Sequence, residues 1–149
     1  MPFHWVDFKT LGKENAFKQI EVLLDEYAID LTVLARFMQI LPDNLCSKLA
    51  GRAINIHHSF LPSFAGAKPY QQAYDRGVKL IGATCHYVTK DLDEGPIIEQ
   101  DILRVDHGAS PESMQESGYD IESAVLLRAV RLYAERRILL NGLKTVVFS

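Results

Sequence analysis

Three polar side chains in the middle of the chain are of the types that stabilise and attack a carbonyl group. Asn55 and His57 stand two residues apart in a strand-like stretch, so both point to the same face of an extended backbone. An amide and an imidazole on one face can donate hydrogen bonds to an oxygen that becomes negative in a tetrahedral intermediate. Asp93 lies in a polar turn and could hold a water molecule and accept its proton.

Each of these residues, taken alone, also fits a purely structural role. An Asn-x-His pair can simply end a strand with satisfied polar groups, and aspartate is common in turns. His86 lies near the end of another apolar stretch, where it could orient Asp93, bind a substrate, or donate to a backbone carbonyl. We therefore expect chemistry only if the three side chains converge in space.

Composition excludes several classes of function. The chain has 149 residues, 48% of them hydrophobic, which suits one domain with a packed core. Its net charge of −3 argues against a nucleic-acid binder. No apolar run approaches the length of a membrane span, and the first residues lack the pattern of a signal peptide. We expect a cytoplasmic protein that binds neither nucleic acid nor membrane.

No metal or nucleotide motif is visible. Cys46 and Cys85 do not form a Cys-x-x-Cys pair, and we expect both thiols to be buried in a reducing compartment. His57 and His58 do not have the spacing of metal ligands. The glycines are scattered, so a phosphate-binding loop is not predicted either.

Hydrophobic periodicity and turn residues predict alternating strands and helices. The predicted helices cover residues 15–27, 42–50, 69–76 and 121–140, the last one capped by Asp120. The predicted strands cover residues 2–8, 30–35, 53–56, 78–88, 97–105 and 145–148. We expect 30–35 to be covered on both faces, 60–68 to be a loop, and 78–88 to pair with 97–105 across the turn at 91–95. The alternation indicates a three-layer α/β fold.

Longer motifs around these residues resemble a known family. The sequence NIHHSFLP at residues 55–62, IGAT at 81–84, HYV at 86–88 and LDEGPIIEQD at 92–101 are similar to formyltetrahydrofolate deformylase, and the similarity covers nearly the whole chain. The resemblance implies a Rossmann-like formyltransferase domain with a mostly parallel, mixed sheet. It also implies hydrolysis of 10-formyltetrahydrofolate to formate and tetrahydrofolate, which supplies formate for purine and one-carbon metabolism.

The resemblance assigns roles by position. Asn55 and His57 would hold the formyl oxygen, and Asp93 would deprotonate the attacking water, without a metal or prosthetic group. The expected folate-binding residues come from two loops and the strand between them: Met38, Gln39, Leu41, His86, Val88, Thr89, Lys90 and Asp91.

Two departures from the family pattern lead to further expectations. No regulatory ACT-type domain is visible, and the chain begins at what resembles the second strand of the catalytic domain, so we expect a partial domain lacking the first strand and helix. Strand exchange or a homo-oligomer could complete such a sheet. Two alternatives stay open: a formyltransferase of the glycinamide ribonucleotide type, against which His58 argues, and an inactive folate-binding remnant.

Overall fold

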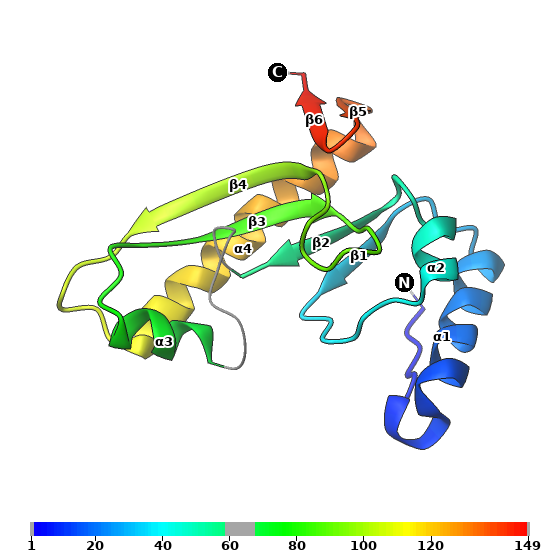
Figure 1. Ribbon diagram of the computed structural model, residues 1–149, viewed down its shortest axis with the longest axis horizontal. Coiled ribbons are helices and arrows are strands. Elements are labelled where there is room, and N and C mark those ends of the chain that lie inside the picture. Colours follow the sequence, from blue (N-terminus) through cyan, green and yellow to red (C-terminus); the bar gives the residue numbers. More distant parts are fainter. Residues whose placement is uncertain (1, 59–67, 149) are drawn as a thin grey trace.

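The computed structural model describes residues 2–58 and 68–148, which form helices around one main β-sheet and a small hairpin (Figure 1). The helices are α1 (Phe8–Glu26), α2 (Asp43–Lys48), α3 (Pro69–Asp75) and α4 (Pro111–Ala134). The strands are β1 (Thr32–Ala35), β2 (Ala53–His57), β3 (Leu80–Tyr87), β4 (Ile97–Arg104), β5 (Ile138–Asn141) and β6 (Lys144–Val147). Within the two described ranges, no helix is long and apolar enough to cross a membrane.

The main sheet has the strand order β1-β2-β3-β4. β1 and β2 run parallel, whereas β2–β3 and β3–β4 are antiparallel. The predicted mixed sheet is therefore confirmed, but the expectation that it is mostly parallel is wrong. The short turn at 88–96 allows only an antiparallel return, because a parallel connection needs a crossover of a dozen or more residues. The predicted pairing of 78–88 with 97–105 is confirmed.

Helices cover both faces of the sheet, which confirms the predicted layers. On one face α4 packs on β2 and β3 through a fully apolar cluster that includes Ile54, Ile56, Cys85, Tyr87, Val125 and Ala129. On the other face α1 and α2 pack beside β1 and β2 through Phe17, Leu45, Cys46, Leu49 and Ala53. Both thiols are buried, as predicted.

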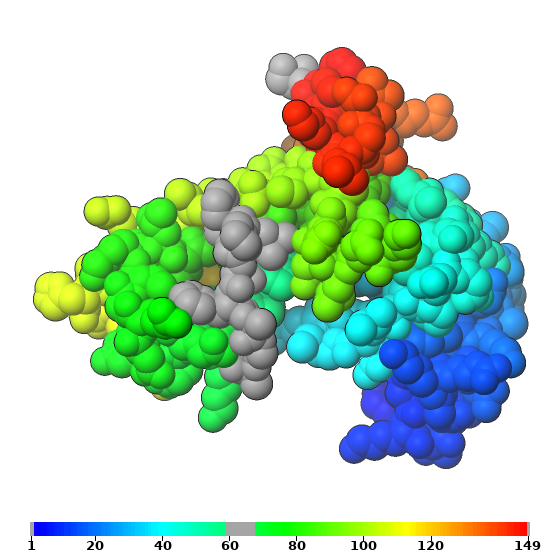
Figure 2. All heavy atoms as spheres, in the orientation of Figure 1, coloured from blue at the N-terminus to red at the C-terminus, as the bar shows by residue number. Residues whose placement is uncertain are grey.

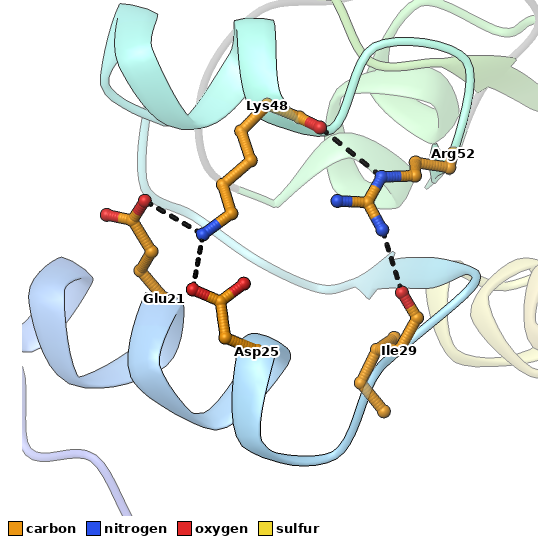
Figure 3. A network of polar contacts seen from close by, with 5 residues as sticks. All are labelled: Glu21, Asp25, Ile29, Lys48 and Arg52. Atoms are coloured by element: carbon orange, nitrogen blue, oxygen red, sulfur yellow. Dashed lines mark hydrogen bonds and ion pairs between the residues drawn. The ribbon is translucent and has the colours of Figure 1, made fainter.

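Polar contacts join α1 to α2 and the start of β2 (Figure 3). The ammonium group of Lys48 donates to Glu21 at 3.0 Å and to Asp25 at 2.7 Å. Arg52 donates to the carbonyls of Lys48 at 3.3 Å and Ile29 at 2.9 Å. Partly exposed ion pairs contribute only about 0.2–1 kcal/mol each to folding stability. The main effect of these contacts is therefore to hold α1 and α2 in place beside the start of β2.

The first residues do not form the predicted strand. Residues 2–7 have no regular structure, and Asp7 caps α1 by accepting from the backbone N–H of Lys9 at 2.9 Å. Gly12, with φ of +73°, interrupts α1, which is why the helical spacing of apolar residues predicts the helix only from residue 15. The strand predicted at 30–35 is present as β1, but its expected cover on both faces is wrong, because Val33 is 39% exposed.

The C-terminal part differs from the prediction in where its helix begins and ends. Ser110, not Asp120, caps α4, accepting from the backbone N–H of Ser113 at 3.2 Å. The helix ends at Ala134, and residues predicted as its last turn form β5, which pairs with β6. Gly142, at φ of +61°, provides the turn of this hairpin. The loop predicted at 60–68 lies almost wholly outside the described residues.

Candidate active site

The polar face of the sheet is set by the register of β2 and β3. Along β2, Ile54 and Ile56 are buried against α4, and Asn55 and His57 point to the opposite face. The antiparallel register places His86 opposite Asn55 and Thr84 opposite His57. Thr84 is fully buried and His86 is 3% exposed, although both are polar. The sequence thus builds one face that is apolar and one that carries amide, imidazole and hydroxyl groups.

Asp93 reaches this face from the 88–96 loop. The loop is anchored where it leaves β3, since the backbone N–H of Val88 donates to Ala53 and that of Tyr87 to Pro96, both at 2.9 Å. Asp93 has a φ of +57°, a left-handed conformation that aspartate tolerates better than most residues. Gly95 passes so close to β3 that a Cβ there would lie 1.7 Å from the carbonyl oxygen of Tyr87. The backbone therefore aims the Asp93 side chain back over the sheet.

The three candidate catalytic side chains meet around His86. Oδ1 of Asp93 lies 3.4 Å from Nδ1 of His57 and 3.6 Å from Nε2 of His86. Nδ2 of Asn55 lies 3.3 Å from Nε2 of His86. The convergence expected from the sequence is present in the structure, with His86 at its centre.

The hydrogen bonds of His86 fix its tautomer. Nδ1 lies 2.9 Å from the carbonyl oxygen of Tyr87, which can only accept, so Nδ1 carries the proton. Nε2 is then an acceptor for the Asn55 amide, which keeps a second N–H for another partner. Of the roles weighed for His86, the structure shows the contact with a backbone carbonyl; the ring also lies beside Asp93 and lines the cavity, so orientation of Asp93 and substrate binding stay predictions.

His57 is held in its neutral form. Burial lowers the pKa of His57, the nearby imidazoles of His58 and His86 act in the same direction, and the carboxylate of Asp93 opposes them. Because the lowering prevails, the imidazole is uncharged near neutral pH. A neutral imidazole can donate one N–H and accept at the other nitrogen.

These side chains open into a cavity of about 200 Å³. Every residue predicted for the site lines it: Met38, Gln39, Leu41, Asn55, His57, His86, Val88, Thr89, Lys90, Asp91 and Asp93. In Figure 2 the cyan surface around residue 40 lies beside the light-green surface around residue 90, which are the two walls of this cavity. The thiol of Cys46 touches both walls, 3.8 Å from the carbonyl of Leu41 and 3.7 Å from that of Thr89.

Further lining residues were not among those predicted for the site. They are Leu34, Arg36, Phe37, Ile40, Ile56, His58 and Leu92. The ring of His58, which follows His57 directly in the sequence, stacks on that of His57 with a centroid distance of 4.8 Å. Arg36 stood in a predicted loop at the end of β1, a position where parallel strands commonly place ligand-binding groups. That position was the signal by which it could have been found.

The arrangement can perform addition of water to a carbonyl carbon. Two hydrogen-bond donors on β2 face the same space as one carboxylate from the loop, with apolar walls on either side. Such a set can stabilise an oxyanion and accept a proton from water. Among the residues that the structure describes, no group of three or more His, Cys, Asp or Glu side chains could hold a metal ion.

Comparisons with known proteins agree with this geometry. Residues 1–130 match the formyl transferase family. A formyltetrahydrofolate deformylase of Bacillus subtilis (strain 168) is 55% identical over 100% of this chain and 50% of its own length. The crystal structure of a formyltetrahydrofolate deformylase from Pseudomonas syringae superposes with a TM-score of 0.94 at 55% identity, over 100% of this chain and 50% of that one.

A phosphoribosylglycinamide formyltransferase from Anaplasma phagocytophilum superposes with a TM-score of 0.83 at 37% identity, over 89% of this chain and 65% of that one. The chain spans about half the length of the curated deformylases it matches. The resemblance read from the motifs is thereby confirmed, and so is the Rossmann-like formyltransferase fold.

Proposed function

The chain belongs to the formyl transferase family, and from this premise we propose that its cavity hydrolyses 10-formyltetrahydrofolate to formate and tetrahydrofolate. The observation that supports this proposal most directly is the convergence of Asn55, His57 and Asp93 in one cavity. The names of the most similar relatives point to the same reaction.

The reaction begins with the formyl oxygen beside Asn55 and His57. The second amide N–H of Asn55 donates to it, and the imidazole of His57 donates as negative charge develops. The separation of 3.4 Å between His57 and Asp93 is longer than a good hydrogen bond, so an arriving oxygen can compete for the imidazole proton.

Asp93 then acts on the water molecule. Its carboxylate accepts a proton from the water as the water oxygen bonds to the formyl carbon, giving a tetrahedral intermediate. The carbon–nitrogen bond breaks when the proton passes from Asp93 to the leaving nitrogen, and formate and tetrahydrofolate result. Every atom comes from the folate and one water molecule, so the route needs neither a metal nor a covalent intermediate with the protein.

Folate recognition is assigned to the two walls of the cavity. Met38 and Leu41 supply apolar surface from one loop, and the 88–93 segment supplies backbone groups from the other. Sites for small molecules commonly combine apolar walls with a few placed polar groups. We propose that the pterin ring lies between these loops, which leaves the formyl-bearing nitrogen N10 of the folate, outside that ring, near His57.

The test is release of formate from 10-formyltetrahydrofolate by the purified 149-residue chain. Formate should appear in equal amount to tetrahydrofolate, and a chain that binds folate without turnover would be the inactive remnant. Adding glycinamide ribonucleotide should leave formate release unchanged. If the added amine became formylated instead, the chain would be a formyltransferase, as the name of the Anaplasma structure suggests for that protein. A cytoplasmic location and a homo-oligomer stay predictions from the sequence.

A further inference from the structure

A second cavity, of about 450 Å³, lies next to the candidate active site. The two cavities share four wall residues, namely Arg36, Met38, Ile56 and His58. The rest of the described wall of the second cavity comes from the start of α3 and the first turns of α4, and none of it from the 88–93 segment. The cavities therefore adjoin at the histidine end of the site, away from the 88–93 segment.

His58 lies on the boundary between the two cavities. Its ring is stacked on His57 at an interplanar angle of 20°, and it lines both spaces. A small molecule that forms beside His57 is therefore close to the second cavity.

Arg36 places a permanent positive charge at the same boundary. Its guanidinium carbon lies 4.0 Å from the centroid of the Tyr119 ring, and Nη2 lies 4.0 Å from Oε2 of Glu122. That separation is at the outer limit of an ion pair, and the Arg36 side chain is 62% exposed. Since a guanidinium has five N–H donors, it retains donors for a further anion.

The carboxylates in the wall are already engaged. Tyr70 donates to Oε1 of Glu122 at 3.0 Å, and this contact depends on Gly118, where a Cβ would lie 1.9 Å from the Tyr70 hydroxyl. Glu112 lies in the first turn of α4, where the helix N-terminus offsets negative charge. Lys68 also lines the cavity and forms no ion pair with any residue in the described ranges. The wall thus contains two cationic side chains, Arg36 and Lys68, and two carboxylates that have other partners.

We propose that the second cavity is the product subsite, in which Arg36 binds the carboxylate of formate while tetrahydrofolate still fills the first cavity. This inference rests on the proposed hydrolysis, because that reaction is what produces a carboxylate beside His57. A guanidinium binds a carboxylate through two parallel N–H···O bonds, which suits an anion as small as formate. Formate then leaves along α3 and α4 without displacing the folate.

The subsite can be tested without turnover by adding ¹³C-formate to the resting protein. Broadening of the formate NMR signal measures binding. The Arg36→Gln variant should weaken formate binding about tenfold, which is what loss of hydrogen bonds to a charged group typically costs. Arg36→Lys keeps the charge but not the paired donors, so its affinity for formate should lie between those of the unaltered chain and of Arg36→Gln. Arg104→Gln, an exposed change on β4 outside both cavities, is the matched control and should bind formate as the unaltered chain does.

Three results would overturn the inference. Formate binding that is equal in Arg36→Gln and Arg104→Gln would remove Arg36 from the site. Displacement of formate by tetrahydrofolate would place it in the first cavity. Tighter, Arg36-dependent binding of p-aminobenzoylglutamate would assign the space to the folate tail. Arg36-dependent formate binding in a chain without turnover would instead leave the subsite standing and refute the proposed hydrolysis, so the two failures are distinguishable.

Discussion

Nδ1 of His57 lies 3.4 Å from Oδ1 of Asp93, although one residue ends strand β2 and the other lies in the loop after β3. Neither residue lies in a helix. Their distance is set by the pairing of β2 with β3 and by the close return of the 88–96 loop over β3. The candidate chemistry therefore depends on strand register and loop shape together.

Replacing Asp93 by Asn should abolish the reaction and spare the fold. Asparagine also tolerates the left-handed backbone conformation, so the loop is retained, but the amide cannot accept a proton from water. We expect formate release to fall by at least about 100-fold, the usual contribution of a general base. Asp120→Asn, an exposed change on α4, should retain full activity with the same melting temperature. Full activity in Asp93→Asn would contradict the assigned role.

His57 should make folding stability depend on pH. Burial lowers the pKa of His57 below its ordinary value of 6.5, so the unfolded chain takes up a proton at higher pH than the folded one. The free energy of unfolding should therefore decrease as the pH falls below about 6.5. Urea unfolding between pH 5 and pH 8 measures this slope, and it should be smaller in His57→Asn. In the control His107→Asn, an exposed position, the slope should not change; equal slopes in both variants would refute the assignment.

Gly95→Ala should distort the cavity. The new methyl group would lie 1.7 Å from the carbonyl oxygen of Tyr87, so the 88–96 loop must move away from β3 and take Asp93 with it. We expect a loss of about 1–3 kcal/mol in stability, as for other overpacked sites, and a lower kcat/KM for the folate. Gly108→Ala is the control, since its nearest contact is a side-chain oxygen at 3.3 Å outside the cavity. Unchanged kinetics in Gly95→Ala would show that the loop adapts.

Two positions on α4 should differ sharply in their cost to stability. Val125 is fully buried against β2 and β3, whereas Leu127 is 70% exposed on the same helix. Val125→Ala should destabilise the chain by about 2 kcal/mol through lost burial and the cavity left behind. Leu127→Ala, in contrast, should cost less than about 0.5 kcal/mol. Chemical denaturation of the two variants measures the difference, and equal values would mean that α4 does not cover the sheet as described.

The candidate site was largely predictable because its residues stand in continuous motifs. Asn55 and His57 follow the two-residue period of a strand, and Asp93 stands in a turn between two strands that pair. What the sequence could not reveal was how the remaining side chains approach one another. The stacking of His58 on His57 and the position of Arg36 between two cavities result from tertiary packing.

The predicted ends of helices and strands were wrong where a local sequence signal was misleading. The apolar residues at 138–140 continue the helical pattern of α4, but the left-handed conformation of Arg136 ends the helix and starts the hairpin. The Asn141–Gly142 pair directly after the predicted helix suits a helix end, and it is an equally strong signal for a hairpin turn. The direction of β3 relative to β2 depends on long-range pairing, which periodicity does not encode.

The two faces of β3 have a consequence for how the chain must fold. A register shift of one residue between β2 and β3 would turn the imidazole of His86 into the apolar core beneath α4. It would also bring the sulfur of Cys85 to the cavity. Such a misaligned form would be less stable for two reasons: an imidazole would be buried without a hydrogen-bond partner, and apolar side chains would be exposed to water. Correct alignment of these strands is thus favoured by the same alternation of side chains that places the candidate catalytic residues on one face of the sheet.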